Sequence, residues 1–178
     1  MAERAHRPGI YVLAGTNGAG KSSLIGAMFE QAGPVDALVS CTGKVKFAAL
    51  EAMTAADYEI GLKDKLMGQV NLVLIGRGHV AEGGSFTLTT GVLDHDPIRL
   101  GSSASMVNGA VNAFVLSAAI EMQRGQRINA VSPGVIKEAM EAYAPYFRGF
   151  EPVPARRAAL AYARSVEGAQ TGQVYRVL

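Results

Sequence analysis

Short apolar runs alternate with amphipathic stretches along most of this chain of 178 residues. Runs rich in apolar and β-branched residues predict buried strands at residues 10–14, 35–40, 85–90, 127–131 and 173–177. Stretches with apolar residues at helical spacing predict helices at residues 20–31 and at about 55–76, 103–124 and 154–166. Strands that alternate with helices are typical of a parallel sheet covered on both faces.

This pattern predicts an α/β fold, a three-layer Rossmann-like sandwich with a shortened parallel sheet of about five strands. We expect the first strand beside the second, then the third, fourth and last, with a right-handed crossover through helix 20–31. Thr54 and Asp57 have the spacing of a capping box and predict the start of the second helix. No repeat or linker divides the sequence, so residues 1–178 are expected to form one domain, with residues 8–31 and 33–178 as its two parts.

The loop between the first predicted strand and helix, residues 15–22, has the sequence G-T-N-G-A-G-K-S. It fits the phosphate-binding pattern G-x-x-x-x-G-K-[ST], in which backbone N–H groups and a helix N-terminus surround an anion. In that pattern the lysine reaches the outer phosphates and the hydroxyl that follows it holds Mg²⁺. The candidate phosphate-binding residues are Gly15, Asn17, Gly18, Gly20, Lys21 and Ser22, and Ser22 is also the candidate metal ligand.

The overall charge and hydropathy exclude several classes of partner. The net charge is +2, with Lys and Arg scattered, which is too small to argue for nucleic acid. No apolar run reaches membrane-spanning length, and the N-terminus lacks the apolar stretch of a signal peptide. We therefore expect a cytoplasmic protein that binds a small-molecule nucleotide, with no nucleic acid and no membrane as partner.

Five short sequence motifs follow the loop, and their order along the chain resembles that of a known family. They are V-S-C-T-G at residues 39–43, K-L-M-G at 65–68, G-S-F-T-L-T-T-G at 84–91, R-I-N-A-V-S-P-G at 127–134 and T-G-Q-V at 171–174. From about residue 33 onward the chain thereby resembles the short-chain dehydrogenase/reductase family. The first, second and fourth segments stand in the places of that family's N-N-A-G, N-x-x-G and R-V-N-x-V-x-P-G motifs.

The resemblance implies an oxidoreductase that binds NAD(P) and acts on a small carbonyl compound or alcohol. Thr42 and Gly43 would lie on the cofactor side of the second strand, and Pro133 and Gly134 would line the nicotinamide side. His95 or an adjacent aspartate, in the loop after the third strand, would be placed to face the substrate.

The resemblance also identifies the candidate catalytic residues Thr90, Lys65 and Asn108. Thr90, or equally its neighbour Thr89, stands in the place of the family's serine. Ala104 and Asn108 stand in the places of its tyrosine and lysine. Alanine cannot transfer a proton and asparagine carries no charge to lower a pKa, so catalysis is expected to be impaired. Lys65, in the place of a structural asparagine, could supply a replacement positive charge.

Residues 8–31 instead resemble the opening of a P-loop kinase of the zeta-toxin type. Two alternatives to the oxidoreductase therefore remain: a P-loop ATP- or GTP-binding protein or phosphotransferase, and a non-catalytic chimeric or truncated nucleotide-binding domain. The expected cofactor is either NAD(P) or ATP/GTP with Mg²⁺. The helices at about 55–76 and 103–124 correspond to a dimer interface in the dehydrogenase family, which implies a homodimer or homotetramer.

Overall fold

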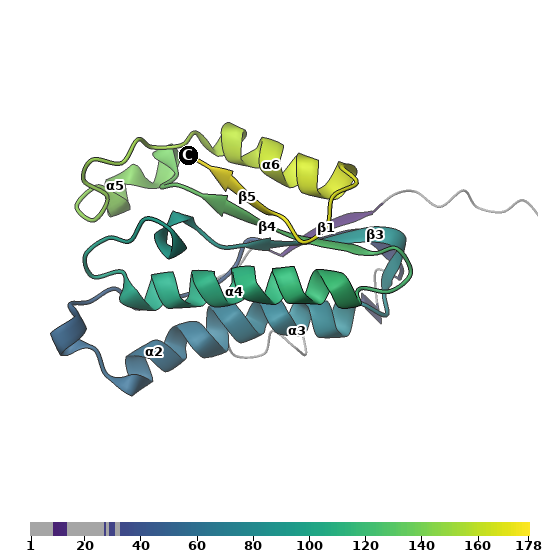
Figure 1. Ribbon diagram of the computed structural model, residues 1–178, viewed down its shortest axis with the longest axis horizontal. Coiled ribbons are helices and arrows are strands. Elements are labelled where there is room, and N and C mark those ends of the chain that lie inside the picture. Colours follow the sequence, from purple (N-terminus) through teal and green to yellow (C-terminus); the bar gives the residue numbers. More distant parts are fainter. Residues whose placement is uncertain (1–8, 14–26, 28, 31–32) are drawn as a thin grey trace, which may run out of the picture.

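The computed structural model describes residues 9–13, 27, 29–30 and 33–178, and in this part of the chain it contains one five-stranded parallel sheet (Figure 1). The neighbouring strands are all parallel, in the order β1-β2-β3-β4-β5. This confirms the fold class and the strand order predicted from the sequence. The strands are β1 (Ile10–Leu13), β2 (Val35–Ser40), β3 (Val80–Thr89), β4 (Arg127–Pro133) and β5 (Val174–Val177).

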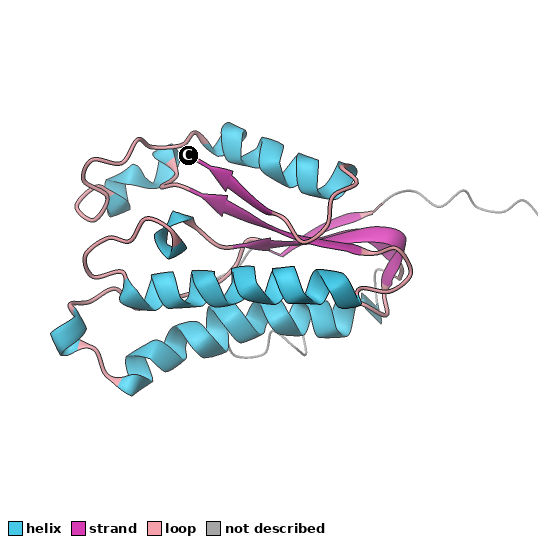
Figure 2. Cartoon of the chain, in the orientation of Figure 1, coloured by secondary structure: helices cyan, strands magenta, loops and turns pink. Residues whose placement is uncertain are grey.

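The helices cover both faces of the sheet (Figure 2). Helices α3 and α4 lie side by side on one face and α6 lies on the other (Figure 1). The helices are α2 (Ala55–Gly61), α3 (Met67–Gly76), α4 (Ser102–Glu121), α5 (Met140–Tyr143) and α6 (Ala155–Glu167). A π-helical segment, Leu62–Leu66, joins α2 to α3, and short 3₁₀ turns lie at Leu50–Ala52, Val92–Asp94 and Lys137–Ala139.

Two predicted elements differ most from the structure in their extent. Strand β3 begins at Val80, five residues before the predicted start, and includes Gly83 and Gly84. Gly83 does have a positive φ of 71°, and the β2–β3 register shifts in the same region, yet the strand continues through it. The predicted helix 55–76 is interrupted by the π-helical segment. Of the predicted helix 20–31, residues 27, 29 and 30 are described and are helical.

The two faces of β3 have different partners. Phe86 and Leu88 are fully buried and belong to the main core cluster, together with Leu72 of α3 and Val111 of α4. Thr87, which lies between them, faces α6, and its hydroxyl forms a hydrogen bond with the Ser165 hydroxyl at 2.7 Å. This alternation follows from the period of two along a strand, and it also decides on which side each threonine at the end of β3 lies.

Helix α4 has the length and composition of a membrane-spanning segment, with a mean hydropathy of 1.4. Its side chains Val107, Val111 and Val115 are nevertheless fully buried. The contacts of α4 with β4 and with α3 are those of a core helix. On its outward side Leu116 and Ile120 are exposed. The expected homodimer or homotetramer stays a prediction.

The turn before β5 is fixed by Asn129, whose side chain is fully buried in β4. Its Nδ2 donates to the carbonyl of Gln170 at 3.0 Å, and its Oδ1 accepts from the backbone N–H of Gln173 at 2.9 Å. Arg127, two residues earlier, donates to the carbonyls of Ser165, Val166 and Gly168 at the end of α6. Arg127 therefore ties β4 to the end of α6, and Asn129 ties it to the turn before β5.

The replacement Asn129→Ala should lower the free energy of unfolding by about 1–3 kcal/mol, because it leaves the N–H of Gln173 and the carbonyl of Gln170 without their partner. Chemical denaturation measures this difference. The matched control is Gln173→Ala, which removes an exposed side chain and keeps the backbone N–H. Equal stability of the wild type and the Asn129 variant would show that these two hydrogen bonds do not stabilise the fold.

Candidate functional site

The candidate site lies where the ends of β2, β3 and β4 come together. Ser40, Thr89 and Pro133 are the last residues of these strands, and parallel strands have their carboxyl ends at one edge of a sheet. In open α/β sheets ligands bind outside this edge. The residues after the strands, from Cys41 to Gly43 and from Thr90 to Gly91, supply the groups described below.

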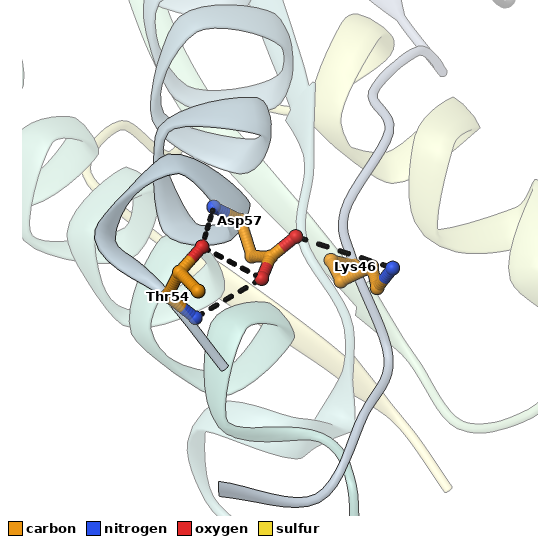
Figure 3. A network of polar contacts seen from close by, with 3 residues as sticks. All are labelled: Lys46, Thr54 and Asp57. Carbon is orange, nitrogen blue, oxygen red and sulfur yellow. Dashed lines mark hydrogen bonds and ion pairs between the residues drawn. The ribbon is translucent and has the colours of Figure 1, made fainter. Parts of the chain in front are cut away.

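Lys65 lies in the π-helical segment Leu62–Leu66. A π-helical turn adds a residue to an α-helix and is frequent at functional sites. The helical run that contains Lys65 is fixed at its start by the predicted capping box, in which Thr54 and Asp57 bond each other's backbone N–H groups (Figure 3). Lys46 lies 4.0 Å from the Asp57 carboxylate, so the loop after β2 also contacts this end (Figure 3). The hydrogen bonds from Thr54 hold the pKa of Asp57 below its usual range.

The Lys65 ammonium joins the predicted catalytic residues. Its Nζ donates to Oδ1 of Asn108 at 2.6 Å and to the backbone carbonyl of Thr90 at 3.2 Å. The Asn108 amide is oriented in turn, because its Nδ2 donates to the carbonyl of Gly91 at 3.2 Å. An ammonium has three N–H donors, so among the described residues one donor of Lys65 is left for a ligand.

Gly43 makes room for the lysine stem. It has a φ of 144°, and a Cβ atom at this position would collide with Cβ and Cγ of Lys65. The glycine is therefore required twice, by its backbone conformation and by the close approach of Lys65. The family resemblance predicted that Gly43 lies beside the cofactor. In the structure Gly43 lies against the side-chain stem of Lys65, the predicted catalytic lysine.

The surroundings of Lys65 make its ammonium more acidic. Desolvation lowers the pKa of Lys65 from 10.5 to about 8, and the negative charge of Asp94 opposes part of this shift. The Asp94 side chain is 10% exposed. It accepts from Nδ2 of Asn112 at 2.8 Å and lies 3.6 Å from the guanidinium of Arg176. An amine with a pKa near neutrality is a suitable proton donor and acceptor.

The structure distinguishes the two threonines that the sequence left open. The Thr89 hydroxyl faces α6, where it bonds Tyr162 at 2.7 Å and the carbonyl of Ser40 at 2.5 Å. Thr90 is buried, its hydroxyl donates to the carbonyl of Val131 at 3.5 Å, and its backbone carbonyl accepts the bond from Lys65. The fully buried amide of Gln69 bonds both backbone groups of Thr89 and fixes the end of β3.

Among the residues whose side chains the structure describes, no tyrosine hydroxyl forms a hydrogen bond with Lys65, Thr90 or Asn108, and Ala104 is itself buried. Tyr162 lies toward the opposite face of the sheet, and burial raises its pKa, so it remains protonated. The hydroxyl of Tyr58 bonds the Ser102 hydroxyl at 2.8 Å at the start of α4. Tyr143 packs in an aromatic cluster with Phe47 and Phe147.

The remaining predicted residues fall into three groups. Pro133 ends β4 and Gly134 follows it, where the Gly134 N–H donates to the carbonyl of Val177 at 2.8 Å, and the Thr42 hydroxyl lies 3.3 Å from that of Ser40. His95 and Asp96 are exposed in the loop after β3. The predicted phosphate-binding residues lie outside the described residues: Gly15, Asn17, Gly18, Gly20, Lys21 and Ser22.

Sequence reasoning missed the direct contacts within the site. The Asp94–Asn112 bond had one signal, since Asn108 and Asn112 are four residues apart and lie on one face of α4. The role of Gln69 had no signal, because a glutamine in a helix is ordinarily a surface residue.

Comparison with known proteins identifies relatives over most of the chain. A family model described as "Enoyl-(Acyl carrier protein) reductase" matches residues 16–178. An uncharacterized oxidoreductase of Methylorubrum extorquens is 31% identical over 114 residues, which are 64% of this chain and 46% of that protein. The chain thus spans less than half of the length of this curated relative.

Solved structures agree with this result. The protein lin1944 from Listeria innocua is 51% identical with a TM-score of 0.86, over 88% of this chain and 78% of that one. A short chain dehydrogenase from Mycobacterium smegmatis is 26% identical with a TM-score of 0.73, over 91% and 66%. A small-chain dehydrogenase in complex with NADPH is 23% identical with a TM-score of 0.77, over 88% and 78%, a likeness that shows the fold alone.

The lowered pKa of Lys65 predicts a pH-dependent stability. The folded protein loses this proton near pH 8 and the unfolded chain near pH 10.5, so between these values the unfolded chain binds more protons. The free energy of unfolding of the wild type should therefore rise across this range, relative to that of Lys65→Met. Denaturation of both proteins at a series of pH values measures the difference in their free energies of unfolding. The contributions of the other titratable groups cancel in this difference, because both proteins contain them.

The control is Lys63→Met, which removes an exposed ammonium two residues away. Its stability difference from the wild type should be nearly constant over the same pH range. A difference between wild type and Lys65→Met that does not change with pH would show that the ammonium is solvated like an ordinary surface lysine.

Proposed function

Since the chain belongs to the short-chain dehydrogenase/reductase family of oxidoreductases, we propose that it transfers hydride between NAD(P) and a small carbonyl compound or alcohol, with Lys65 in place of the missing tyrosine. The observation that supports this most directly is the contact of Lys65 with Asn108 and with the carbonyl of Thr90. It gathers a proton donor, an amide and a hydroxyl-bearing residue at the ligand-binding edge of the sheet.

The residues at this edge fit the nicotinamide half of such a cofactor. Pro133 and Gly134 present backbone at the carboxyl end of β4, and the one N–H donor of Lys65 that the described residues leave unused is kept for the carbonyl oxygen of the substrate. Ser132, the residue before them, has a fully buried hydroxyl without a hydrogen-bond partner among the described residues. When bound, a reduced nicotinamide supplies hydride to the carbonyl carbon.

The chain's own residues then act on the carbonyl oxygen. The hydroxyl of Thr90, which donates to the carbonyl of Val131 at 3.5 Å in the structure, would turn to donate a hydrogen bond to it, and Lys65 would donate a proton as negative charge develops there. Asn108 orients the ammonium through its Oδ1 atom. Asp94 favours the charged form of Lys65 by opposing the effect of desolvation on its pKa. After proton transfer the neutral amine of Lys65 recovers a proton from water.

This proposal predicts that Lys65→Met abolishes most of the reductase activity, by about 10²–10⁴-fold in kcat, the usual contribution of a positioned proton donor. Activity is measured as NADPH or NADH consumption with a panel of small ketones and aldehydes. Lys63→Met should be fully active, because its ammonium is exposed. Reduction by the wild type should decline as the pH rises through about 8, since Lys65 must be protonated, and alcohol oxidation should increase.

Two outcomes would contradict the proposal. An active wild type with an equally active Lys65→Met variant would remove Lys65 from the chemistry. A wild type that consumes neither cofactor with any carbonyl of the panel would favour the non-catalytic nucleotide-binding alternative.

The second candidate function comes from the phosphate-binding pattern at residues 15–22, whose sequence fits that of ATP- and GTP-binding loops. Under this alternative ATP with Mg²⁺ binds at least as well as NAD(P), and Lys21→Ala weakens ATP binding selectively. Calorimetric titration of wild type and variant with ATP, NADP and NAD distinguishes the two. Tight NAD(P) binding that is indifferent to Lys21 would contradict the ATP alternative and favour the oxidoreductase.

A further inference from the structure

The loop between β3 and α4 and the segment after α5 form the two walls of an open groove with a volume of about 490 Å³. Both segments follow the carboxyl ends of strands, β3 and β4, so the groove belongs to the same end of the molecule as Lys65. Its lining residues are Pro97, Ile98, Arg99, Leu100, Pro145, Tyr146, Arg148 and Phe150.

The groove combines two positive charges with an apolar wall. Arg99 and Arg148 are its only charged lining residues. Both are exposed, and among the described residues neither forms an ion pair, although Asp96 and Glu151 are three residues away in the sequence. Two guanidinium groups without acidic partners attract an anion, and the flat guanidinium fits a carboxylate or phosphate in particular.

The apolar wall is held in place by aromatic packing. The ring of Phe150 packs edge-on against that of Phe147, with 5.4 Å between the ring centroids. The rings of Tyr146 and Phe47 pack with 5.8 Å between their centroids. Phe147 is buried in a core cluster with Val92, Leu93 and Ala104, against which Ile98 and Phe150 also pack. This wall can accept the apolar part of a ligand without rearranging the core.

The backbone at the edge of the groove is strained. Leu100 has a φ of 68°, which is uncommon for a residue other than glycine. Its carbonyl accepts from the backbone N–H of Ala48 at 3.1 Å, and the N–H of the next residue, Gly101, donates to the carbonyl of Ile98 at 3.3 Å. Strain of this kind is concentrated at ligand-binding and active sites, where surrounding contacts enforce it.

One continuous segment connects the groove with the candidate site. At its start the carbonyl of Gly91 accepts from Asn108, and Asp94 acts on the charge of Lys65. At its end Arg99 and Leu100 line the groove. A ligand in the groove therefore contacts the segment that helps to position the lysine and its amide partner.

We propose that this groove binds the anionic end of the substrate, a carboxylate or phosphate on an apolar body, through Arg99 and Arg148. The assignment of this ligand as the substrate rests on the proposed function, whereas the anion site itself does not. The groove takes the apolar body against Phe150 and Tyr146 and holds the charged group between the two guanidinium groups.

Direct binding tests the groove without catalysis. The probe is octanoate, with octanamide as its neutral match, titrated by ligand-observed NMR against the protein without cofactor. The wild type should bind octanoate about tenfold more tightly than octanamide, and added salt should reduce the difference. Each single variant, Arg99→Ala or Arg148→Ala, should weaken octanoate binding about threefold to fivefold, and the double variant should bind the two probes alike.

The controls separate a specific site from general attraction. Arg156→Ala removes an exposed arginine at the start of α6 and should leave octanoate binding unchanged. The double lysine variant, Arg99→Lys with Arg148→Lys, should retain part of the preference for octanoate. The inference is overturned if the wild type binds octanoate and octanamide alike, or if Arg156→Ala weakens octanoate binding as much as the groove variants.

The same preparations distinguish this inference from the proposed function. Arginine-dependent octanoate binding by a protein that consumes no NAD(P)H leaves the anion site standing and removes the proposed reductase activity. A working reductase whose octanoate binding is indifferent to both arginines overturns the groove and leaves the catalytic proposal intact.

Discussion

The candidate site depends on one interaction, the hydrogen bond from the partly buried ammonium of Lys65 to the amide oxygen of Asn108. Removing an ammonium from water is costly unless carbonyl groups and a counter-charge replace the solvent. Here the acceptors are Asn108 and the backbone of Thr90, and the counter-charge is Asp94. The compensation is incomplete, which is why the pKa of Lys65 remains below that of a surface lysine.

The hydrogen bond between Lys65 and Asn108 also bears on the two residue types, which stand here at each other's positions in the family. In the family that the sequence resembles, the positions of Lys65 and Asn108 hold an asparagine and a lysine, and here the two residue types are reversed. The ammonium of Lys65, which comes from the π-helical segment, lies 2.6 Å from the amide oxygen of the residue that stands on α4 at the family's lysine position. Gly43 has the complementary role of leaving space for the lysine stem.

The segment between β3 and α4 serves both the site and the groove. It begins at the carbonyl that orients Asn108, passes through Asp94 and ends at the strained Leu100. Its apolar residues Val92 and Leu93 are buried, so its polar groups are held at fixed positions on either side of a core cluster. A loop anchored in this way can place a charge against the lysine and another against a ligand without a change in the sheet.

The parallel sheet, the order of its strands and the capping box at Thr54 could be predicted from the amino-acid sequence alone, because they follow from hydrophobic periodicity and local hydrogen bonding. The sequence also picked out Thr90, Lys65 and Asn108 through a family resemblance. It could not tell Thr89 from Thr90, because their sides depend on where β3 ends against its neighbours. The bond between Lys65 and Asn108 joins residues 43 positions apart. Only the packing of two helices, one shifted in phase by a π-helical turn, decided that these side chains meet.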